Sequence, residues 1–430
     1  ARPDDGPPED GAPRPGLARA QTQAAPPVAP RTPPRFSEAA ERFLARKVEE
    51  RGRSYRENSS DNVKATVKLV LEAFGDLRVD AFTEEHMRQL TSILRSTPYL
   101  RGKGRNDPLF EHIALAEAKR DEAAAWAEEM KAQGLPRGDI ETRVARMLKR
   151  WRPLAPPTIW RKQQEVLAIF ELCREQGEIL VNPMRTVIWS KKQMKALKRE
   201  HADNARLPWG DKIVELFSST IFTSRLDDPG EPLFWAPLIG FLMGMRMEEI
   251  LQLKLGDLET ECGVPIIRVR RGDGQHVKSE AGRRRVPIHP ALIELGLLEL
   301  VALRRREGRE WLFPHLERSA QRGRLSGPFS KRFTNYRVKE GIYDELRDFH
   351  SLRADCNIQM KHAGVPLDAR KRLLGHAYDD VTDVDYDKEG YPIETLRDFI
   401  ARIRLDIGGV VRPFGGGTGA SAASRFRIVS

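Results

Sequence analysis

Cysteines and long apolar runs are scarce in this sequence. Its 430 residues hold three cysteines, Cys173, Cys262 and Cys356, an odd number spread far apart. They predict neither a disulfide framework nor a zinc cluster, and we expect small buried thiols. No stretch approaches the about eighteen apolar residues that span a bilayer, and the opening segment lacks the apolar core of a secretory signal. These absences favour a cytoplasmic protein with no membrane partner.

Negative charge is also in short supply. The sequence has 62 aspartates and glutamates against 73 lysines and arginines, which gives a net charge of +11 and an isoelectric point of about 9.6. Such a balance favours a polyanionic partner, either a nucleic acid or a membrane surface. Since the mean hydropathy is -0.53 and long apolar runs are missing, a nucleic acid is the expected partner.

Composition divides the chain into five parts. Residues 1–35 are rich in proline and alanine, which predicts a disordered arm. Residues 36–190 carry apolar residues at helical spacing and predict an all-helical domain. The remaining parts are a basic linker at 191–206, a mixed domain at 207–405 and a flexible tail at 406–430.

The linker is marked by a run of lysines that includes Lys191, Lys192 and Lys195. A solvated charge run is the simple interpretation. In a DNA-binding protein the same lysines would lie along phosphates. The sequence leaves both interpretations open.

The mixed domain contains a short β signal within a helical pattern. Residues 266–270 and 285–288 alternate in strand fashion around the glycine-rich segment 272–282. They predict a twisted hairpin whose basic face, with Arg268 and Arg270, faces DNA. The fold class is therefore mainly α with a small β-sheet, an α+β protein in two domains.

Motifs in the mixed domain carry side chains suited to phosphate chemistry. In order they are Gly-Met-Arg246-Met-Glu-Glu249, Lys278 in the hairpin, His350-Ser-Leu-Arg353, Leu-Leu-Gly-His376 and Tyr386. Cutting a phosphodiester without metal requires a nucleophile, neutralisation of the non-bridging oxygens and a proton for the leaving oxygen. These motifs supply all three.

The motifs, in this order and with close local spacing, resemble the phage integrase family of tyrosine recombinases. The resemblance covers the whole second domain, and the helical first domain is similar to the family's core-binding domain. It implies a C-shaped clamp of two domains around double-stranded DNA. It also implies DNA cutting and rejoining through a 3′-phosphotyrosine, with no metal, ATP or other cofactor. The usual assembly would be a homotetramer on two DNA sites, with accessory directionality factors as further partners.

Two arginines are the expected phosphate ligands. Arg246 and Arg353 each offer a planar fork of donors that matches the two non-bridging oxygens. His350 lies three residues before Arg353, hence on the same face of a helix, where it could transfer a proton or hydrogen-bond the phosphate. An ordinary surface salt bridge is the alternative for each arginine. His289 and His362 lack such placement, and we expect them at the surface.

Lys278 is the candidate general acid for the leaving 5′ oxygen. It is the only lysine between Lys254 and Lys331. An ammonium group can give up a proton when desolvated among positive charges, whereas a guanidinium cannot. A solvated hairpin lysine is the alternative. Glu249 matches the acid of the family motif and is expected to orient Arg246 or Lys278, unless it is an ordinary helix-surface carboxylate.

Tyr386 is the candidate nucleophile. The phenolate form is favoured beside two arginines. Tyr378 is too near His376, which by resemblance donates to a phosphate oxygen, and Tyr391 lies beyond the family's usual spacing. Tyr386 follows His376 by ten residues, one more than is common in the family. After it, an apolar stripe at helical spacing would dock either on a neighbouring protomer or on its own domain: Ile393, Leu396, Phe399 and Ile400.

Three alternative functions remain open at the level of sequence. A type IB topoisomerase would share the chemistry but relax supercoils as a monomer. A non-catalytic DNA-binding regulator would share the fold, although no catalytic residue type is missing. A metal nuclease would need a clustered acidic site, and the sequence does not contain one.

Overall fold

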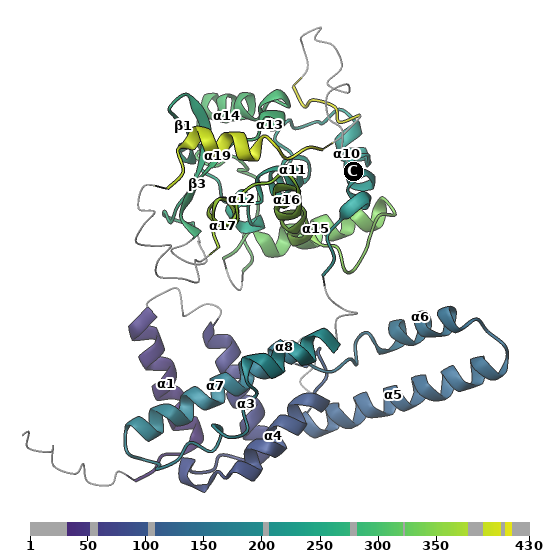
Figure 1. Cartoon of the computed structure of the whole chain (residues 1–430), viewed down its shortest axis with the longest axis vertical. Helices are drawn as coiled ribbons and strands as arrows, with labels where there is room; N and C mark the ends of the chain where they lie inside the picture. The colour runs from purple at the N-terminus through teal and green to yellow at the C-terminus, as the bar shows by residue number, and fades with distance from the viewer. Residues whose placement is uncertain are drawn as a thin grey trace, which may run out of the picture. The chain divides into compact units, whose positions relative to one another are not determined.

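The computed structural model describes residues 32–51, 59–101, 108–200, 206–275, 282–320, 323–376, 390–405 and 409–414. The chain divides into two compact units, Ala1–Lys198 and Arg199–Ser430. Both units are shown in Figure 1.

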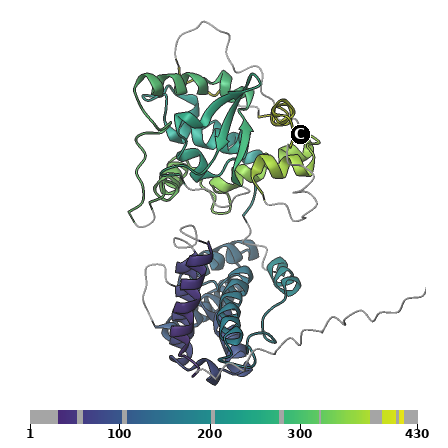
Figure 2. The same cartoon turned by 90° about the vertical axis from the view of Figure 1, so that its left-hand side faces the viewer.

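In the part that the structure describes, unit 1 is helical. Its core is formed by rings such as Phe36, Phe82 and Phe170, whose centroids lie 5.4–5.5 Å apart. Helices α1 and α7 run side by side (Figures 1 and 2). The elements are α1 (Phe36–Arg51), α3 (Ser59–Phe74), η1 (Val79–Ala81), α4 (Glu84–Ser96), α5 (Leu109–Ala132), α6 (Arg137–Leu148), α7 (Pro156–Glu175) and α8 (Lys191–Glu200).

Helices α6 and α8 complete unit 1. Helix α6 returns along α5 as a hairpin that extends away from the other helices of the unit (Figure 1). Helix α8 occupies most of the segment predicted as a linker. Its lysines are exposed and only Met194 and Leu197 are half-buried. Amphipathic spacing of these two residues within a very polar segment explains why the helical pattern was weak.

Unit 2 is mostly helical around a small antiparallel sheet, as predicted. The sheet has the order β1-β2-β3. The elements are η3 (Gly210–Lys212), α9 (Ile213–Phe217), α10 (Thr220–Thr223), α11 (Pro232–Met243), α12 (Met247–Leu251), η4 (Leu255–Asp257), β1 (Leu258–Glu261), β2 (Val264–Val269), β3 (Arg284–Pro287), α13 (Pro290–Glu294), α14 (Leu297–Arg306), α15 (Ser326–Lys339), α16 (Phe349–His362), α17 (Leu367–Leu374) and α19 (Ile393–Ile400).

The predicted pairing of β2 with β3 is confirmed, with Ile267 opposite Val286. Strand β1 was not predicted. It joins β2 through a tight turn in which Cys262 and Gly263 have φ of 49° and 76°. Successive positive φ values suit a two-residue hairpin turn. Cys262 is exposed there, so the expectation of a buried thiol is wrong for this residue, while Cys173 and Cys356 are buried.

The core of unit 2 surrounds α11, whose residues from Leu233 to Met243 are all buried. Helix α16 packs against α11 and α17 (Figure 1). Helix α19 packs against β3, and its apolar stripe belongs to the core of its own unit. Docking on its own domain is therefore the alternative that the structure supports.

His289 corrects another prediction, because it lies in this core rather than at the surface. It is 4% exposed, and its ring meets the carbonyl of Ile403 at 2.9 Å. Its Nδ1 accepts the Ala291 N–H and so caps α13. The capping position comes before a proline, a local signal that was available in the sequence. His362 is exposed, as predicted.

Candidate active site

The site is built around the end of α11. Gly244 ends this helix with φ of 62°, in the left-handed region. A Cβ at this position would lie 2.4 Å from Leu374 Cδ2 and 2.9 Å from Cys356 Sγ. Only glycine fits both the conformation and the space. The turn places Arg246 at the start of α12.

Arg246 is held by two partners. Its Nη1 donates to Glu249 Oε1 at 2.7 Å, and its Nη2 donates to the carbonyl of Gly375 at 2.8 Å. Its backbone N–H donates to Glu249 Oε2 at 2.9 Å. The side chain remains 22% exposed, so part of the guanidinium can still reach a ligand.

Arg353 is held by backbone carbonyls. Its Nη1 donates to Gly244 and its Nη2 donates to Leu374. Burial lowers its pKa to about 9, and the charges of Arg246 and Arg284 contribute to this lowering. The group therefore remains cationic at neutral pH.

Glu249 is a buried partner of two arginines rather than a surface carboxylate. Burial by itself would raise its pKa, but the attraction of Arg284 and Arg246 outweighs burial and lowers the pKa to about 2. The sequence predicted a contact with Arg246 or Lys278. The structure shows the contact with Arg246 and adds Arg284, whose Nη2 donates to Glu249 Oε2 at 2.8 Å.

Arg284 was missed by the sequence reasoning. It is the middle residue of an arginine triplet at the start of β3. Side chains alternate along a strand, so Arg284 shares the face of the buried Val286, whereas Arg285 is on the other face. That alternation is the signal that could have found it.

The two predicted histidines lie at helix ends close to these arginines. His376 follows Gly375, which ends α17 with φ of 62°. Partial desolvation lowers the pKa of His376 to about 4, and the charges of Arg353, Arg246 and Arg284 contribute to this lowering. His350 lies in the first turn of α16, where desolvation, then Arg206 and Arg353, lower its pKa. His376 is therefore neutral at pH 7, so one of its ring nitrogens can donate and the other can accept.

The structure thus brings together four of the six predicted catalytic residues, Arg246, His350, Arg353 and His376, with the predicted supporting residue Glu249. Lys278 and Tyr386 lie outside the described residues. So does Tyr378. Tyr391 is described, and its hydroxyl donates to Asp368 Oδ2 at 2.6 Å while its ring packs on Phe399.

The predicted DNA-binding residues fall into two groups. Lys191, Lys192 and Lys195 are exposed on α8. Arg268 and Arg270 of the hairpin are instead paired, Arg268 with Glu259 and Arg270 with Asp257, each at 2.8 Å.

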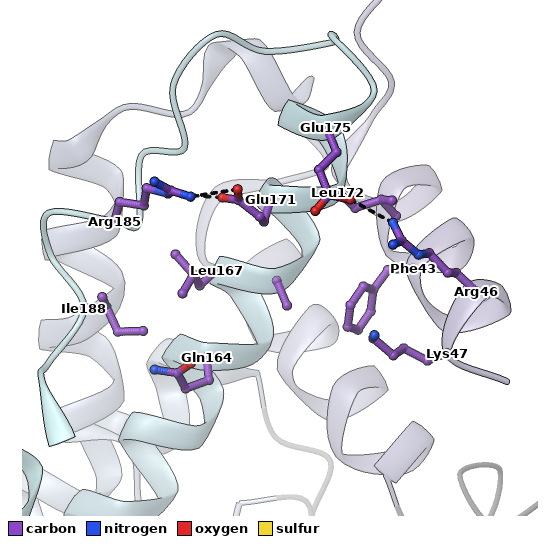
Figure 3. A pocket seen from close by; sticks show the side chains of 11 residues that line it. Phe43, Arg46, Lys47, Gln164, Leu167, Glu171, Leu172, Glu175, Arg185 and Ile188 are labelled. Carbon is purple, nitrogen blue, oxygen red and sulfur yellow. Dashed lines mark hydrogen bonds and ion pairs between the residues drawn. The ribbon is translucent and has the colours of Figure 1, made fainter. Parts of the chain in front are cut away.

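A cavity of about 610 Å³ lies in unit 1. Its apolar surface includes Phe43, Leu167 and Ile188 (Figure 3). Ion pairs at its rim join Arg46 to Glu175 and Arg185 to Glu171. None of the predicted site residues lines it.

Comparison with known families decides the identity of unit 2. Residues 238–390 match the model of the phage integrase family. This part of unit 2 is a domain of the phage integrase family. The chain is a tyrosine recombinase, an enzyme of site-specific DNA strand breakage and rejoining. None of the described helices is long and apolar enough to cross a membrane.

Similar solved structures are integrases at low sequence identity. The Tn1549 transposon integrase in complex with transposon right end DNA shares 14% identity over 85% of this chain and 99% of that chain, with a TM-score of 0.46. A lambda integrase dimer bound to a COC′ core site shares 15% over 84% and 79%, with a TM-score of 0.45. The integrase from mycobacterium phage Brujita shares 17% over 72% and 98%, with a TM-score of 0.33. Among curated proteins, none matches this chain.

Proposed function

We propose that this recombinase cuts and rejoins double-stranded DNA through a 3′-phosphotyrosine on Tyr386, with no metal, ATP or other cofactor. The observation that carries the proposal is the convergence of Arg246, Arg353 and His376 on the end of α17. Two cations and a neutral imidazole meet there, a combination suited to a phosphate whose charge grows during reaction.

The position of Tyr386 in the chain supports its role. It lies between His376 and Gly390, and both are tied to α17. A Cβ on Gly390 would lie 1.8 Å from Arg372 Cζ, so the backbone at Gly390 lies against the guanidinium of Arg372. Tyr391, the next residue, hydrogen-bonds Asp368 of the same helix. The described residues on either side of the Tyr386 segment, His376 and Gly390, therefore both lie next to α17.

Each residue has a defined part in the proposed reaction. Arg246 and Arg353 bind the two non-bridging oxygens with N–H groups that their present partners do not use. The Tyr386 phenolate attacks phosphorus, a Tyr–O–P bond forms, and the bond from phosphorus to the 5′ oxygen breaks. Lys278 gives its proton to that oxygen. His350 and His376 donate hydrogen bonds to the phosphate, and attack by a 5′ hydroxyl on the phosphotyrosine reverses the step.

DNA binding is proposed to use both units. Residues 36–190 would form the core-binding domain and residues 207–405 the catalytic domain of a C-shaped clamp, joined by 191–206. Lys191, Lys192 and Lys195 would lie along phosphates, with Arg268 and Arg270 as weaker contacts because each already has a carboxylate partner. A homotetramer on two DNA sites, accessory directionality factors and a cytoplasmic, nucleoid-associated location complete the proposal.

The test uses a pool of random-sequence duplex DNA in EDTA. After denaturation, DNA that stays attached to the wild-type chain is recovered and sequenced, which also yields the preferred site. Tyr386→Phe removes one oxygen and should abolish attachment while leaving DNA affinity unchanged. Tyr391→Phe, as the matched control, should keep it. Undiminished attachment in the Tyr386 variant would contradict the proposal.

A further inference from the structure

Arg284 is a buried cation that the proposed reaction does not use. Its side chain and that of Glu249 are each 3% exposed. Its Nη1 donates to Glu249 Oε1 at 3.2 Å and to the carbonyl of Gly282 at 2.8 Å. Its Nη2 donates to Glu249 Oε2, and its Nε donates to the carbonyl of Leu373 at 2.8 Å. Every nitrogen of the guanidinium therefore has a partner.

Three arginines bind three consecutive carbonyls at the end of α17. Arg284 donates to Leu373, Arg353 to Leu374 and Arg246 to Gly375. The last carbonyls of a helix have no donor within the helix, and the helix dipole makes this end attractive to cations. His376 is the next residue. The three arginines therefore fix the backbone from which the side chain of His376 extends.

Glu249 links Arg284 to Arg246. Each oxygen of its carboxylate accepts from both: Oε1 from the two Nη1 atoms, and Oε2 from Arg284 Nη2 and the backbone N–H of Arg246. The position of the carboxylate, and through it the guanidinium of Arg246, thus depends on Arg284.

The bond to Gly282 adds a third connection. Gly282 is the described residue that precedes β3, and it follows Lys278 by four positions in the sequence. Arg284 therefore joins Gly282, the carboxylate beside Arg246 and the end of α17 beside His376.

We propose that Arg284 is a positioning residue for the recombination reaction: through Glu249 it positions Arg246, and through the carbonyl of Leu373 it positions the end of α17 that carries His376. This role rests on the proposed function. Arg284 does not itself touch the DNA. A buried ion pair that served only the fold would affect stability and all functions together, whereas a positioning residue affects the chemical step in a chain that still folds and binds.

The test compares Arg284→Lys with Arg285→Lys. Lysine keeps the charge beside Glu249, so the fold should survive, but a single ammonium cannot reproduce the three-way fork. Arg285 is the adjacent residue of β3, on the other face, where it pairs with Glu261. Three quantities are measured for each variant: the thermal midpoint, the affinity for DNA carrying the recovered site, and the single-turnover rate of covalent attachment to a nicked duplex of that site.

Arg284→Lys should slow attachment by about 10- to 100-fold, with DNA affinity and thermal midpoint close to those of Arg285→Lys. Combined with Glu249→Gln, its effect on the rate should be far from multiplicative, because both changes act on the same ion pair. Equal rates for the two lysine variants, a parallel loss of folding and affinity, or multiplicative effects would each overturn the role. A wild-type chain that forms no covalent product would instead overturn the proposed function on which the role rests.

Discussion

Arginines occur in two different settings within unit 2. On the sheet and just beyond the end of β2, Arg268, Arg270 and Arg285 have carboxylate partners in Glu259, Asp257 and Glu261. At the end of α17, the guanidinium groups of Arg246 and Arg284 share the single carboxylate of Glu249, and Arg353 hydrogen-bonds only to neutral backbone carbonyls. The first set is electrically balanced and the second has a surplus of positive charge. The surplus marks the place where a phosphate would supply the missing negative charge.

The largest expected effect comes from replacing an arginine at the end of α17, where positive charge is in excess. Arg353→Lys keeps the charge but cannot reach both Gly244 and Leu374 while presenting a fork to phosphate. We expect the rate of covalent attachment to fall by about 10²–10³-fold, with DNA affinity retained. Single-turnover kinetics on the recovered site, beside a binding titration, checks this. An unchanged rate would remove Arg353 from the reaction.

The next largest effect is expected at Gly244, in the turn that places Arg246. Gly244→Ala should lower the free energy of unfolding by about 2–4 kcal/mol, since it combines a left-handed backbone with a clash against Leu374. Gly308 has φ of 64° and open space around its Cβ position. Gly308→Ala, the control, should cost about 1 kcal/mol. Urea unfolding measures both, and equal costs would show that the close packing around Gly244 contributes nothing.

Acid should lower the free energy of unfolding through the buried His289. Burial lowers the pKa of His289 to about 4, below the ordinary value of about 6.5. Its contribution to stability is therefore complete above pH 6.5 and is lost as the pH falls from about 6.5 toward 4. The expected loss is about 3 kcal/mol. In His289→Gln, urea unfolding at a series of pH values should show a smaller loss of stability in acid, because the part due to His289 is gone while the parts due to His376 and His350 remain. A pH dependence equal to that of wild type would contradict the assignment.

The exposed lysines of α8 are expected to act on binding alone. Replacing Lys191, Lys192 and Lys195 together with glutamine should make the plot of log affinity against log salt shallower, by about 0.9 for each phosphate that the protein no longer neutralises. The attachment rate at saturating DNA should not change. Salt titrations of wild type and variant give the comparison, and identical slopes would place these lysines off the DNA.

The smallest effect on DNA binding should come from the arginines that already have carboxylate partners. Arg268 is already paired with Glu259, so it is expected to neutralise little of the charge on DNA phosphates. The variant Arg268→Gln should therefore change the salt slope by less than the loss of one α8 lysine does. A change as large as that of an α8 lysine would mean that the pair with Glu259 opens on DNA.

The same contrast explains what the sequence could predict. Arg246 and Arg353 lie in short motifs whose spacing is visible, and the strand pairing of 266–270 with 285–288 followed from alternation. Arg284 could not be distinguished from Arg283 and Arg285 without deciding which strand face is buried. His289 was assigned to the surface because its burial depends on Ile403, more than a hundred residues away. Strand β1, with the sequence Leu-Glu-Thr-Glu, is too short and too polar to show a strand pattern. Interactions local in sequence were predictable, and those set by tertiary packing were not.

The most direct test of the central claim is the identity of the residue that carries DNA. The wild-type chain is incubated in EDTA with a nicked duplex of its recovered site, the covalent product is digested with protease and nuclease, and the modified peptide is sequenced by mass spectrometry. We expect a phosphonucleotide on Tyr386, within the peptide that follows His376. A modification on Tyr378, on Tyr391 or on any other residue would contradict it.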